Sequence, residues 1–364
     1  MLIKAAVLRA HDKPYQIEDL ELAEPGPGEI RVRIAGTGMC HSDLLPRVPN
    51  YVAKPPIITG HEGSGVVEAV GSGVTGLELG DHVVLSFDSC RTCANCQSAQ
   101  AAYCDTFLAR NLIGVGVDGS SPVTDADDKP VASRWFGQSS FATHVLASAR
   151  NAVRVSKDLP LELLGPLGCG VQTGAGSVLL ALDVRAASSI VVFGAGGVGL
   201  SAVMAAKVAG AATIIAVDLN PARLELAREL GATHTFDGAD ENLVAAVQEA
   251  TSGGAHYSLD TTGLPAVIST AIRALRSTGT CGLVGIQRGD LVIDPSDLAV
   301  GRTVTGIIEG SAVPQVFIPQ LIALWEQGLF PFDRLIQTFP LDRINEAEQA
   351  TLSGAVVKPV LIPA

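Results

Sequence analysis

The run IVVFGAGGVGLSAVMAAKVAGAATIIAVD, from Ile190 to Asp218, decides the fold. Before Asp218 its only charged residue is Lys207, and a membrane-spanning helix needs about 20 mostly apolar residues, so a membrane span has to be considered. Four glycines between residues 194 and 199 interrupt the run, however, and β-branched residues stand at both of its ends. This pattern predicts a strand, a turn, a helix and a second strand, as in the βαβ units of a parallel sheet.

The turn of this unit, residues 194–199, has the sequence GAGGVG, which matches G-x-G-x-x-G. The motif alone is weak evidence, but here it follows a strand, opens an apolar helix and precedes by 19 residues an aspartate at the end of the next strand. In dinucleotide-binding folds such glycines permit a tight turn, the approach of a pyrophosphate and close helix packing. A glycine-rich turn beside a solvated aspartate is the alternative. The context favours a dinucleotide site with the candidate residues Gly194, Gly196, Gly197, Val198, Gly199 and Asp218.

Asp218 and Arg223 make opposite predictions about the nucleotide. A carboxylate at the end of the second strand accepts hydrogen bonds from the adenosine ribose hydroxyls and repels a 2′-phosphate, which favours NAD. An arginine near the ribose can hold that phosphate, which favours NADP. Because the carboxylate would stand unfavourably close to a phosphate, Asp218 should decide, and we expect NAD as the cofactor.

The chain divides into a β-rich part and a part in which strands and helices alternate. Short alternating runs such as 29–34 predict an antiparallel β domain, and residues 118–130 predict an exposed loop or hairpin. In the second half the pattern is that of a parallel sheet. We expect an α/β protein in which residues 1–165 and 312–364 form the β-rich domain and residues 166–311 form a doubly wound parallel-sheet (Rossmann) domain.

Individual elements of the second half can be predicted from their ends. Asn220 can cap a helix, Pro221 suits its first position and Gly231 suits a left-handed end. The apolar runs and these signals predict the following elements: strands 190–193, 213–217, 257–259, 281–286 and 356–362, and helices 221–230 and 241–251.

Composition limits the class of protein. Of 364 residues, 47% are hydrophobic and only 17% are charged, below the roughly 25% typical of globular proteins, so disorder is excluded. The net charge is −12 and no dense cluster of Lys and Arg occurs, which argues against nucleic acid and anionic membranes as partners. Residues 1–7 lack the basic start and longer apolar core of a secretory signal, so we expect a cytoplasmic protein with a small-molecule partner.

Four of the seven cysteines are closely spaced. Their pattern, C-x2-C-x2-C-x7-C, lets a short lobe over residues 88–106 fold around one zinc ion with four thiolates in a closed tetrahedron, which is a structural site. Four unconnected core cysteines are the alternative, but the residues between them are polar. The predicted ligands are Cys90, Cys93, Cys96 and Cys104.

Three further ligand-type residues, Cys40, His61 and Cys169, each stand among glycines. Taken singly, each cysteine is as readily a small core residue and the histidine a satisfied surface group. Spacing alone therefore does not decide between metal ligands and structural residues.

With these motifs in this order, the sequence resembles the zinc-dependent medium-chain dehydrogenases over essentially its whole length. The resemblance implies a GroES-like β domain, a second zinc held by Cys40, His61 and Cys169, Glu62 beside it, and Asp43 orienting His61. The chemistry agrees, because three protein ligands leave a fourth position for a substrate oxygen and a neighbouring carboxylate fixes a histidine tautomer. We therefore expect two Zn²⁺ per chain, one catalytic and one structural.

The runs 135–143 and 161–170 resemble those of the bacterial aryl-alcohol, or benzyl-alcohol, dehydrogenases. Some related enzymes act on allylic alcohols such as geraniol. The resemblance implies reversible oxidation of apolar primary alcohols, aryl or allylic, to aldehydes, with hydride transfer to NAD. Two alternatives stay open: a glutathione-linked formaldehyde dehydrogenase of the same family, and a non-catalytic protein that binds NAD and zinc. The family also implies a homo-oligomer, either a dimer or a tetramer.

The resemblance implies roles for further residues. Ser42 is placed to take the hydroxyl proton, but Leu45 stands where liver-type relatives end the proton relay with a histidine, so the proton must leave by another route. Phe87 matches an aromatic of the substrate pocket, although a core phenylalanine is nearly as good an interpretation. The remaining matches concern the cofactor: His41 and Lys358 at the pyrophosphate, each with a solvated charge as the alternative, and Thr173 at the nicotinamide. Arg223, Gly285 and Ile286 are further candidate cofactor-binding residues.

Overall fold

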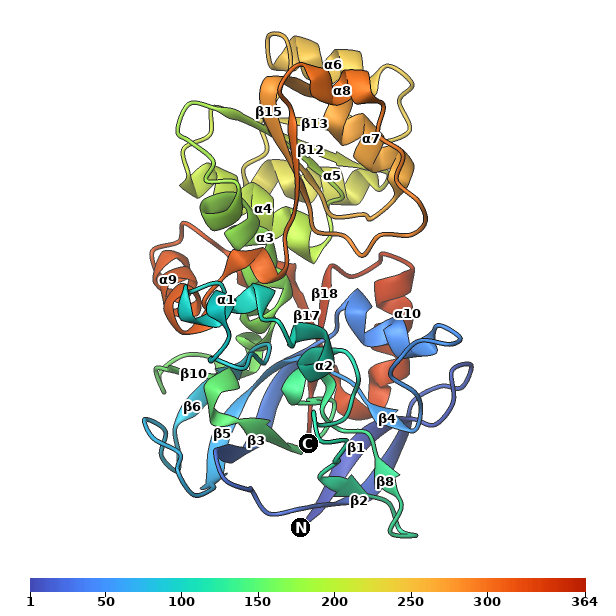
Figure 1. The fold of residues 1–364 in the computed structure, drawn as a ribbon, viewed down its shortest axis with the longest axis vertical. Coiled ribbons are helices and arrows are strands. Elements are labelled where there is room, and N and C mark those ends of the chain that lie inside the picture. The colour runs from blue at the N-terminus through green and yellow to red at the C-terminus, as the bar shows by residue number, and fades with distance from the viewer. The chain divides into compact units, whose positions relative to one another are not determined.

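The computed structural model describes residues 1–364, which form two compact units. Unit 1 comprises residues 1–169, 313–319 and 333–364, and unit 2 comprises residues 170–312 and 320–332. Figure 1 shows the β-rich unit 1 and the helix-covered sheet of unit 2.

Unit 2 is built on a parallel sheet of six strands in the order β13-β12-β11-β14-β15-β16. The order reverses between β11 and β14, and this reversal is the switch point of a doubly wound sheet. The strands are β11 (Ser189–Phe193), β12 (Thr213–Asp218), β13 (His234–Asp237), β14 (Ala255–Asp260), β15 (Leu275–Leu283) and β16 (Thr303–Gly306). The helices are α3 (Gly170–Gly176), α4 (Gly197–Val208), α5 (Pro221–Leu230), α6 (Leu243–Ala250), α7 (Pro265–Arg273) and α8 (Pro295–Ala299).

Helices cover both faces of this sheet, which explains why four of the five residues of β11, Ile190 to Phe193, are apolar. All five residues of β11 are buried. Val191 and Phe193 belong to a core cluster with residues of α6 and α7. Val192 faces α4 instead, because its Cγ1 atom lies 3.4 Å from the position that a Cβ at Gly199 would take. Successive side chains of a strand point to opposite faces, so a strand buried on both faces needs a continuous apolar run. The run 190–218 is accordingly β11, α4 and β12, and no helix of the chain has the length and apolar character needed to cross a bilayer.

The predicted ends of α5 are confirmed. The Asn220 side chain accepts a hydrogen bond from the Ala222 amide, Pro221 opens the helix, and Gly231 ends it with a φ of 128°. The strand predicted over 281–286 was placed too late, because it is β15, Leu275–Leu283. Its first half is largely polar and exposed, so apolar periodicity could not reveal it.

Unit 1 contains two sheets. One has the order β4-β1-β2-β7-β8, and the other has the order β10-β6-β5-β3-β18-β17, with β9 also paired to β3. The strands are β1 (Leu2–Leu8), β2 (Gln16–Leu22), β3 (Glu29–Gly38), β4 (Ile57–Ile58), β5 (Glu62–Val70), β6 (His82–Leu85), β7 (Val123–Thr124), β8 (Pro130–Val131), β9 (His144–Ser148), β10 (Ala152–Val155), β17 (Ile336–Pro340) and β18 (Lys358–Ile362). The helices are α1 (Ala94–Gln97), α2 (Phe107–Asn111) and α10 (Ile344–Leu352), and α9 (Pro314–Glu326) is divided between the units.

Strand β3 is the centre of the second sheet of unit 1. It pairs with β5, β9 and β18, and Ile30, Val32 and Ile34 alternate into the core as the sequence predicts. The segment 118–130 contains β7, the turn that follows it and the first residue of β8, and β7 and β8 pair as a small hairpin. The chain is thus an α/β protein with a β-rich unit and a doubly wound parallel-sheet unit, as the sequence predicts.

Candidate active site

Four potential metal ligands meet in unit 1: Cys40, His61, Glu62 and Cys169, whose ligand atoms all lie within 4.8 Å of one another. Cys40 follows β3, His61 and Glu62 stand at the start of β5, and Cys169 ends the first segment of unit 1. Strands β3 and β5 are paired from Ile30 with Val70 to Gly38 with Glu62, and this pairing brings Cys40 close to His61 and Glu62.

Asp43 holds the histidine of this group in one orientation. The Asp43 Oδ1 atom lies 2.7 Å from His61 Nδ1 and also accepts hydrogen bonds from the Gly60 amide and Trp135 Nε1. A carboxylate only accepts, so Nδ1 carries a proton and Nε2 is the ring nitrogen that is left to face the sulfurs. Nε2 lies 3.2 Å from the Cys169 sulfur. The histidine is thus prepared to bind a metal through Nε2.

The surroundings favour a thiolate at Cys40. A hydrogen bond with Cys169 is the largest cause that lowers the pKa of the Cys40 thiol well below its usual value, and His61 and the charge of Lys358 lower the pKa further, against the effect of burial. Thiolate and imidazole ligands are those that zinc prefers. The donor set therefore fits a zinc ion.

Glu62 is paired with Lys358. Lys358 Nζ lies 2.8 Å from Glu62 Oε1 and donates to the Met39 carbonyl, and both charged side chains are buried. Burial raises the pKa of Glu62, while the Glu62 charge keeps the pKa of Lys358 above its usual value. A Cβ at Gly38 would overlap Glu62 Oε2, which explains a glycine there. The ammonium of Lys358 is thus engaged with Glu62, and its role at a pyrophosphate stays a prediction.

A row of aromatic rings ends on His61. The Phe136 ring stacks on the imidazole, with centroids 4.2 Å apart and planes 19° apart. Phe107 meets Phe136 edge-on at 6.5 Å, and Phe87 lies 5.7 Å from Phe107. Phe87 thus belongs to this row. The sequence did not assign Phe107 or Phe136, because a phenylalanine of a pocket and one of a core look alike in sequence.

The second metal-type cluster consists of the four closely spaced cysteines, whose sulfurs also lie within 4.8 Å of one another. The Cys90 sulfur accepts hydrogen bonds from the amides of Thr92 and Cys93, and the Cys104 sulfur accepts one from the Cys90 amide. Hydrogen bonds from Thr92 are the main cause that lowers the pKa of Cys90 to about 5. Amide donors that point at sulfur stabilise thiolates, so this lobe also fits zinc.

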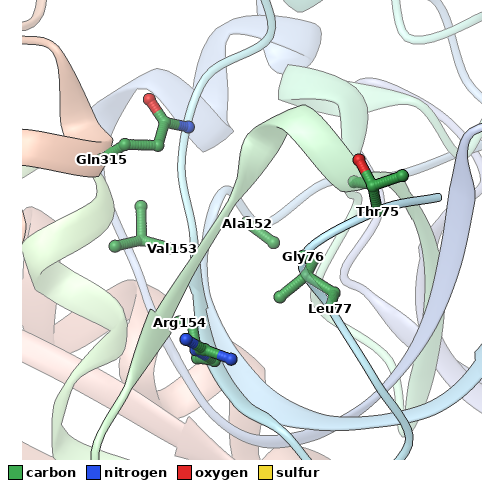
Figure 2. Close-up of a pocket in the computed structure, with 8 residues that line it drawn as sticks. Thr75, Gly76, Leu77, Ala152, Val153, Arg154 and Gln315 are labelled. Carbon is green, nitrogen blue, oxygen red and sulfur yellow. The ribbon is translucent and has the colours of Figure 1, made fainter.

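The lobe is attached to the rest of unit 1 by charge pairs. Asp88, just before Cys90, is paired with Arg110 and Arg150, and Arg91 donates to Gln315 and to the Arg150 carbonyl. A cavity of about 360 Å³ lies beside this attachment (Figure 2) and contains none of the predicted site residues. Its lining includes Thr75, Gly76, Leu77, Val153, Arg154 and Gln315.

Unit 2 provides the geometry expected of a dinucleotide turn. Gly194 has a φ of 93°, and a Cβ at Gly199 would overlap the Gly194 carbonyl oxygen. At Gly196 the nearest atom to an added Cβ is Arg223 Nη1 at 3.9 Å, so the backbone there is open to a ligand. The turn after β11 is therefore closely packed at Gly199 and open at Gly196, as the binding of a pyrophosphate requires.

Asp218 and Arg223 both contact this turn. The Asp218 carboxylate accepts hydrogen bonds from the amides of Ala195 and Asn220, at 2.6 and 2.8 Å. Arg223 Nη1 donates to the Ala195 carbonyl at 3.1 Å. The arginine is thus anchored at the turn beside the carboxylate that would face a ribose.

The remaining predicted residues are distributed over the two units. Ser42 is half-buried, with its Oγ 3.9 Å from the Cys40 sulfur, and His41 is exposed. Thr173 donates a hydrogen bond to Glu309, a residue that the sequence did not single out. Gly285 and Ile286 follow the end of β15. The predicted residues of unit 1 are Cys40, His41, Ser42, Asp43, His61, Glu62, Phe87, Cys90, Cys93, Cys96, Cys104, Cys169 and Lys358, and those of unit 2 are Thr173, Gly194, Gly196, Gly197, Val198, Gly199, Asp218, Arg223, Gly285 and Ile286.

Comparison with known proteins identifies the family. Residues 26–157 match the family "Alcohol dehydrogenase GroES-like domain" and residues 197–327 match "Zinc-binding dehydrogenase". Geraniol dehydrogenase of Castellaniella defragrans is 48% identical over 99% of this chain and 97% of its own length. The chain belongs to the zinc-dependent medium-chain alcohol dehydrogenases. It is thus a zinc alcohol dehydrogenase, a class that acts on small alcohols.

Two solved structures resemble this dehydrogenase over its full length. The crystal structure of an alcohol dehydrogenase zinc-binding domain protein from Burkholderia ambifaria has 50% identity and a TM-score of 0.97, with 100% of this chain and 99% of that chain covered. The structure of benzyl alcohol dehydrogenase from Acinetobacter calcoaceticus has 43% identity and a TM-score of 0.96, with both chains covered completely. The predicted fold class and family are therefore confirmed.

Proposed function

We propose that this dehydrogenase oxidises apolar primary alcohols, aryl or allylic, to aldehydes and passes the hydride reversibly to NAD. The observation that carries the proposal is the row Phe87, Phe107 and Phe136, which ends on the imidazole of His61. Aromatic side chains bind flat apolar groups such as a phenyl ring or an alkene by stacking and by burial of apolar surface. The names of the geraniol and benzyl alcohol dehydrogenases to which the chain is similar support the same substrate class.

Within this proposal Cys40, His61 and Cys169 hold the catalytic zinc. The bound ion supplies a Lewis acid that lowers the pKa of an alcohol hydroxyl. Because the Glu62 carboxylate is bonded to Lys358, it balances the charge of the site instead of completing the ligand set. The four cysteines of the lobe hold a second zinc, and with four protein ligands that site is structural.

The chain's own residues then have separate tasks. Asp43 fixes the tautomer of His61, and the aromatic row excludes water and orients the carbinol carbon. Ser42 would take the hydroxyl proton and pass its own hydroxyl proton on toward solvent, to which it is partly exposed. NAD, when bound, would supply the acceptor for the hydrogen that leaves the carbinol carbon with its electron pair. The alcohol thereby loses one proton and one hydride, and an aldehyde results.

The cofactor in this proposal is NAD, bound by unit 2. The turn 194–199 receives the pyrophosphate and Asp218 the adenosine ribose, and the geometry at Gly196 and Gly199 supports this placement. The other cofactor contacts proposed are those of His41, Thr173, Arg223, Gly285, Ile286 and Lys358. The homo-oligomer, whether dimer or tetramer, and the cytoplasmic location also stay predictions from the sequence.

The test is a panel of substrates. Purified protein with two zincs per chain is mixed with benzyl alcohol, geraniol, ethanol, sorbitol or S-hydroxymethylglutathione, each with NAD and with NADP, and reduced nicotinamide is followed by absorbance. We expect the highest kcat/KM for benzyl alcohol or geraniol with NAD, and almost no turnover in the Cys169→Ser variant. If S-hydroxymethylglutathione gives the highest kcat/KM, the protein is instead a glutathione-linked formaldehyde dehydrogenase. Silence with every substrate would favour a non-catalytic protein.

A further inference from the structure

A buried carboxyl group lies just beyond the end of β16. Glu309 is only 7% exposed and stands at the start of a short 3-10 turn, Glu309–Ser311. Its Oε2 atom accepts hydrogen bonds from Gln172 Nε2 and Thr173 Oγ1 in α3, each at 3.3 Å. All of these residues belong to unit 2. The sequence pattern did not predict a functional acidic residue at this position.

The position of Glu309 is tightly constrained. Glu309, Gly310 and Ser311 all have left-handed backbone conformations, with φ values of 49°, 65° and 56°. A Cβ at Gly310 would lie 2.6 Å from the Gln172 carbonyl oxygen, and a Cβ at Gly176 would lie 2.5 Å from the Gly310 carbonyl oxygen. Left-handed residues other than glycine are strained and persist only where the surroundings hold them, commonly at functional sites. The turn is therefore clamped against α3.

Helix α3 connects this carboxyl group to the dinucleotide turn. A Cβ at Gly174, the residue after Thr173, would overlap the Val198 carbonyl oxygen and lie 2.8 Å from the Ser201 Cβ atom. Val198 is part of the G-x-G-x-x-G turn, and Ser201 is in α4. Thr173, together with the Glu309 carboxyl group to which it donates, thus lies close to the turn that is proposed to bind the dinucleotide.

The topology shows which end of the nucleotide meets Glu309. Parallel sheets of this kind bind a dinucleotide at the carboxyl ends of their strands, one nucleotide over each half of the sheet. The half with β11, β12 and β13 carries the glycine turn and Asp218, which suit the adenosine end. Glu309 follows the carboxyl end of β16 in the other half. The nicotinamide end therefore lies on the side of Glu309.

We propose that the Glu309 carboxylate makes this dehydrogenase bind the oxidised cofactor in preference to the reduced one. The oxidised nicotinamide ring carries a positive charge, which it loses when it accepts a hydride. A carboxylate in a buried, weakly screened setting attracts the charged ring and not the neutral one. Glu309 thereby favours binding of NAD and release of NADH, the two cofactor steps of alcohol oxidation. This inference rests on the proposed function, because it assumes that the cofactor is NAD.

Binding measurements without any alcohol test the proposal. Isothermal titration of the zinc-loaded protein with NAD, NADH and ADP-ribose is compared between wild type and Glu309→Gln. We expect the Kd for NAD to rise about tenfold, a charge-pair effect under partial screening, while the Kd for NADH changes less than about twofold. ADP-ribose lacks the nicotinamide, so its Kd stays constant. The exposed Glu249 of α6 provides the matched control, Glu249→Gln, which leaves all three constants unchanged.

The other outcomes overturn the proposal. An equal loss of affinity for NAD and NADH assigns Glu309 a packing role alone, and unchanged affinities remove any role in binding. If the glutamine variant does not fold, Glu309→Met, which is neutral and similar in length, carries the same comparison. Failure of the NAD assignment in the proposed function has a different signature, since wild type would then bind none of the three ligands, whereas failure of the substrate assignment alone shows in the substrate panel and leaves these Kd values intact. Wild type that binds all three with no effect of Glu309→Gln contradicts only the role of Glu309.

Discussion

The ring of Phe136 lies stacked on the imidazole of His61, with their centroids 4.2 Å apart. Phe136 adopts a left-handed backbone conformation with a φ of 49°, so the stacking is held at a conformational cost. One face of the metal-binding histidine is thereby covered by an apolar ring. This relationship connects the aromatic row proposed to bind the substrate with the candidate metal ligands and leads to the first prediction.

Replacement of Phe136 by alanine should weaken the use of apolar alcohols. Burial of a phenylalanine-sized surface contributes about 1.5–3 kcal/mol, so kcat/KM for benzyl alcohol or geraniol should fall about 10- to 100-fold. Ethanol, which is too small to use the ring, should be affected less. Phe136→Leu keeps an apolar side chain and serves as the control. An equal loss for ethanol and benzyl alcohol in steady-state kinetics would contradict the assignment.

Asp43→Asn should loosen the catalytic metal. The amide can present a donor to His61 Nδ1 and so disturbs the tautomer that frees Nε2, and changes to such partners typically cost about 10- to 100-fold in metal affinity. Competition with a chelator, followed by metal analysis, measures the effect. The exposed Asp19 of β2 provides a control, Asp19→Asn, that keeps wild-type affinity. Unchanged zinc retention in Asp43→Asn would show that the carboxylate is dispensable.

Cys93→Ser should remove the structural zinc and lower stability. Metal analysis should fall from two zincs per chain to one, and the thermal midpoint should drop, because an ion at a thousand times its Kd stabilises the fold by about 4 kcal/mol. Cys281 is a buried core residue outside both metal clusters, so Cys281→Ala should retain two zincs. Two zincs in Cys93→Ser would refute the four-cysteine site.

Asp218→Ala should relax the preference for NAD over NADP. The carboxylate that repels a 2′-phosphate is lost, while Arg223 stays anchored at the turn by the Ala195 carbonyl. We expect the ratio of kcat/KM for NADP to that for NAD to rise at least tenfold, or about 1.4 kcal/mol. Asp237 pairs with Asp218 across β12 and β13 and is exposed, so Asp237→Ala is a near-neighbour control. If Asp218→Ala still prefers NAD, a residue other than Asp218 determines the cofactor preference.

Ser42→Ala should slow hydride transfer. Loss of a positioned proton acceptor typically costs about 10²- to 10⁴-fold in rate. Single-turnover kinetics with deuterated alcohol isolates this step, and Ser42→Thr, which keeps a hydroxyl, should recover much of the rate. Near-normal turnover in Ser42→Ala would mean that the proton leaves by a route without Ser42.

The sequence by itself determined the elements that depend on short-range interactions. The cap at Asn220, the end at Gly231 and the tight turn at Gly194 all follow from conformational preferences of single residues. The cysteine lobe could be predicted as well, because its four sulfurs lie within 15 residues and a short loop brings them together at little entropic cost.

Tertiary structure alone decided the contacts between distant residues. Phe136 stacks on a histidine 75 positions earlier, Lys358 pairs with Glu62 across 296 positions, and Glu309 binds Thr173 across 136. None of these pairs has a local pattern, because a buried phenylalanine, lysine or glutamate receives its partner only when strands and helices pack in one register. The ligand types at Cys40, His61 and Cys169 could be named from the sequence and the family resemblance, whereas only the folded chain brings them together, Cys40 and His61 through the pairing of β3 with β5. Short-range preferences act within a few residues, and burial and long-range packing act only in the folded chain.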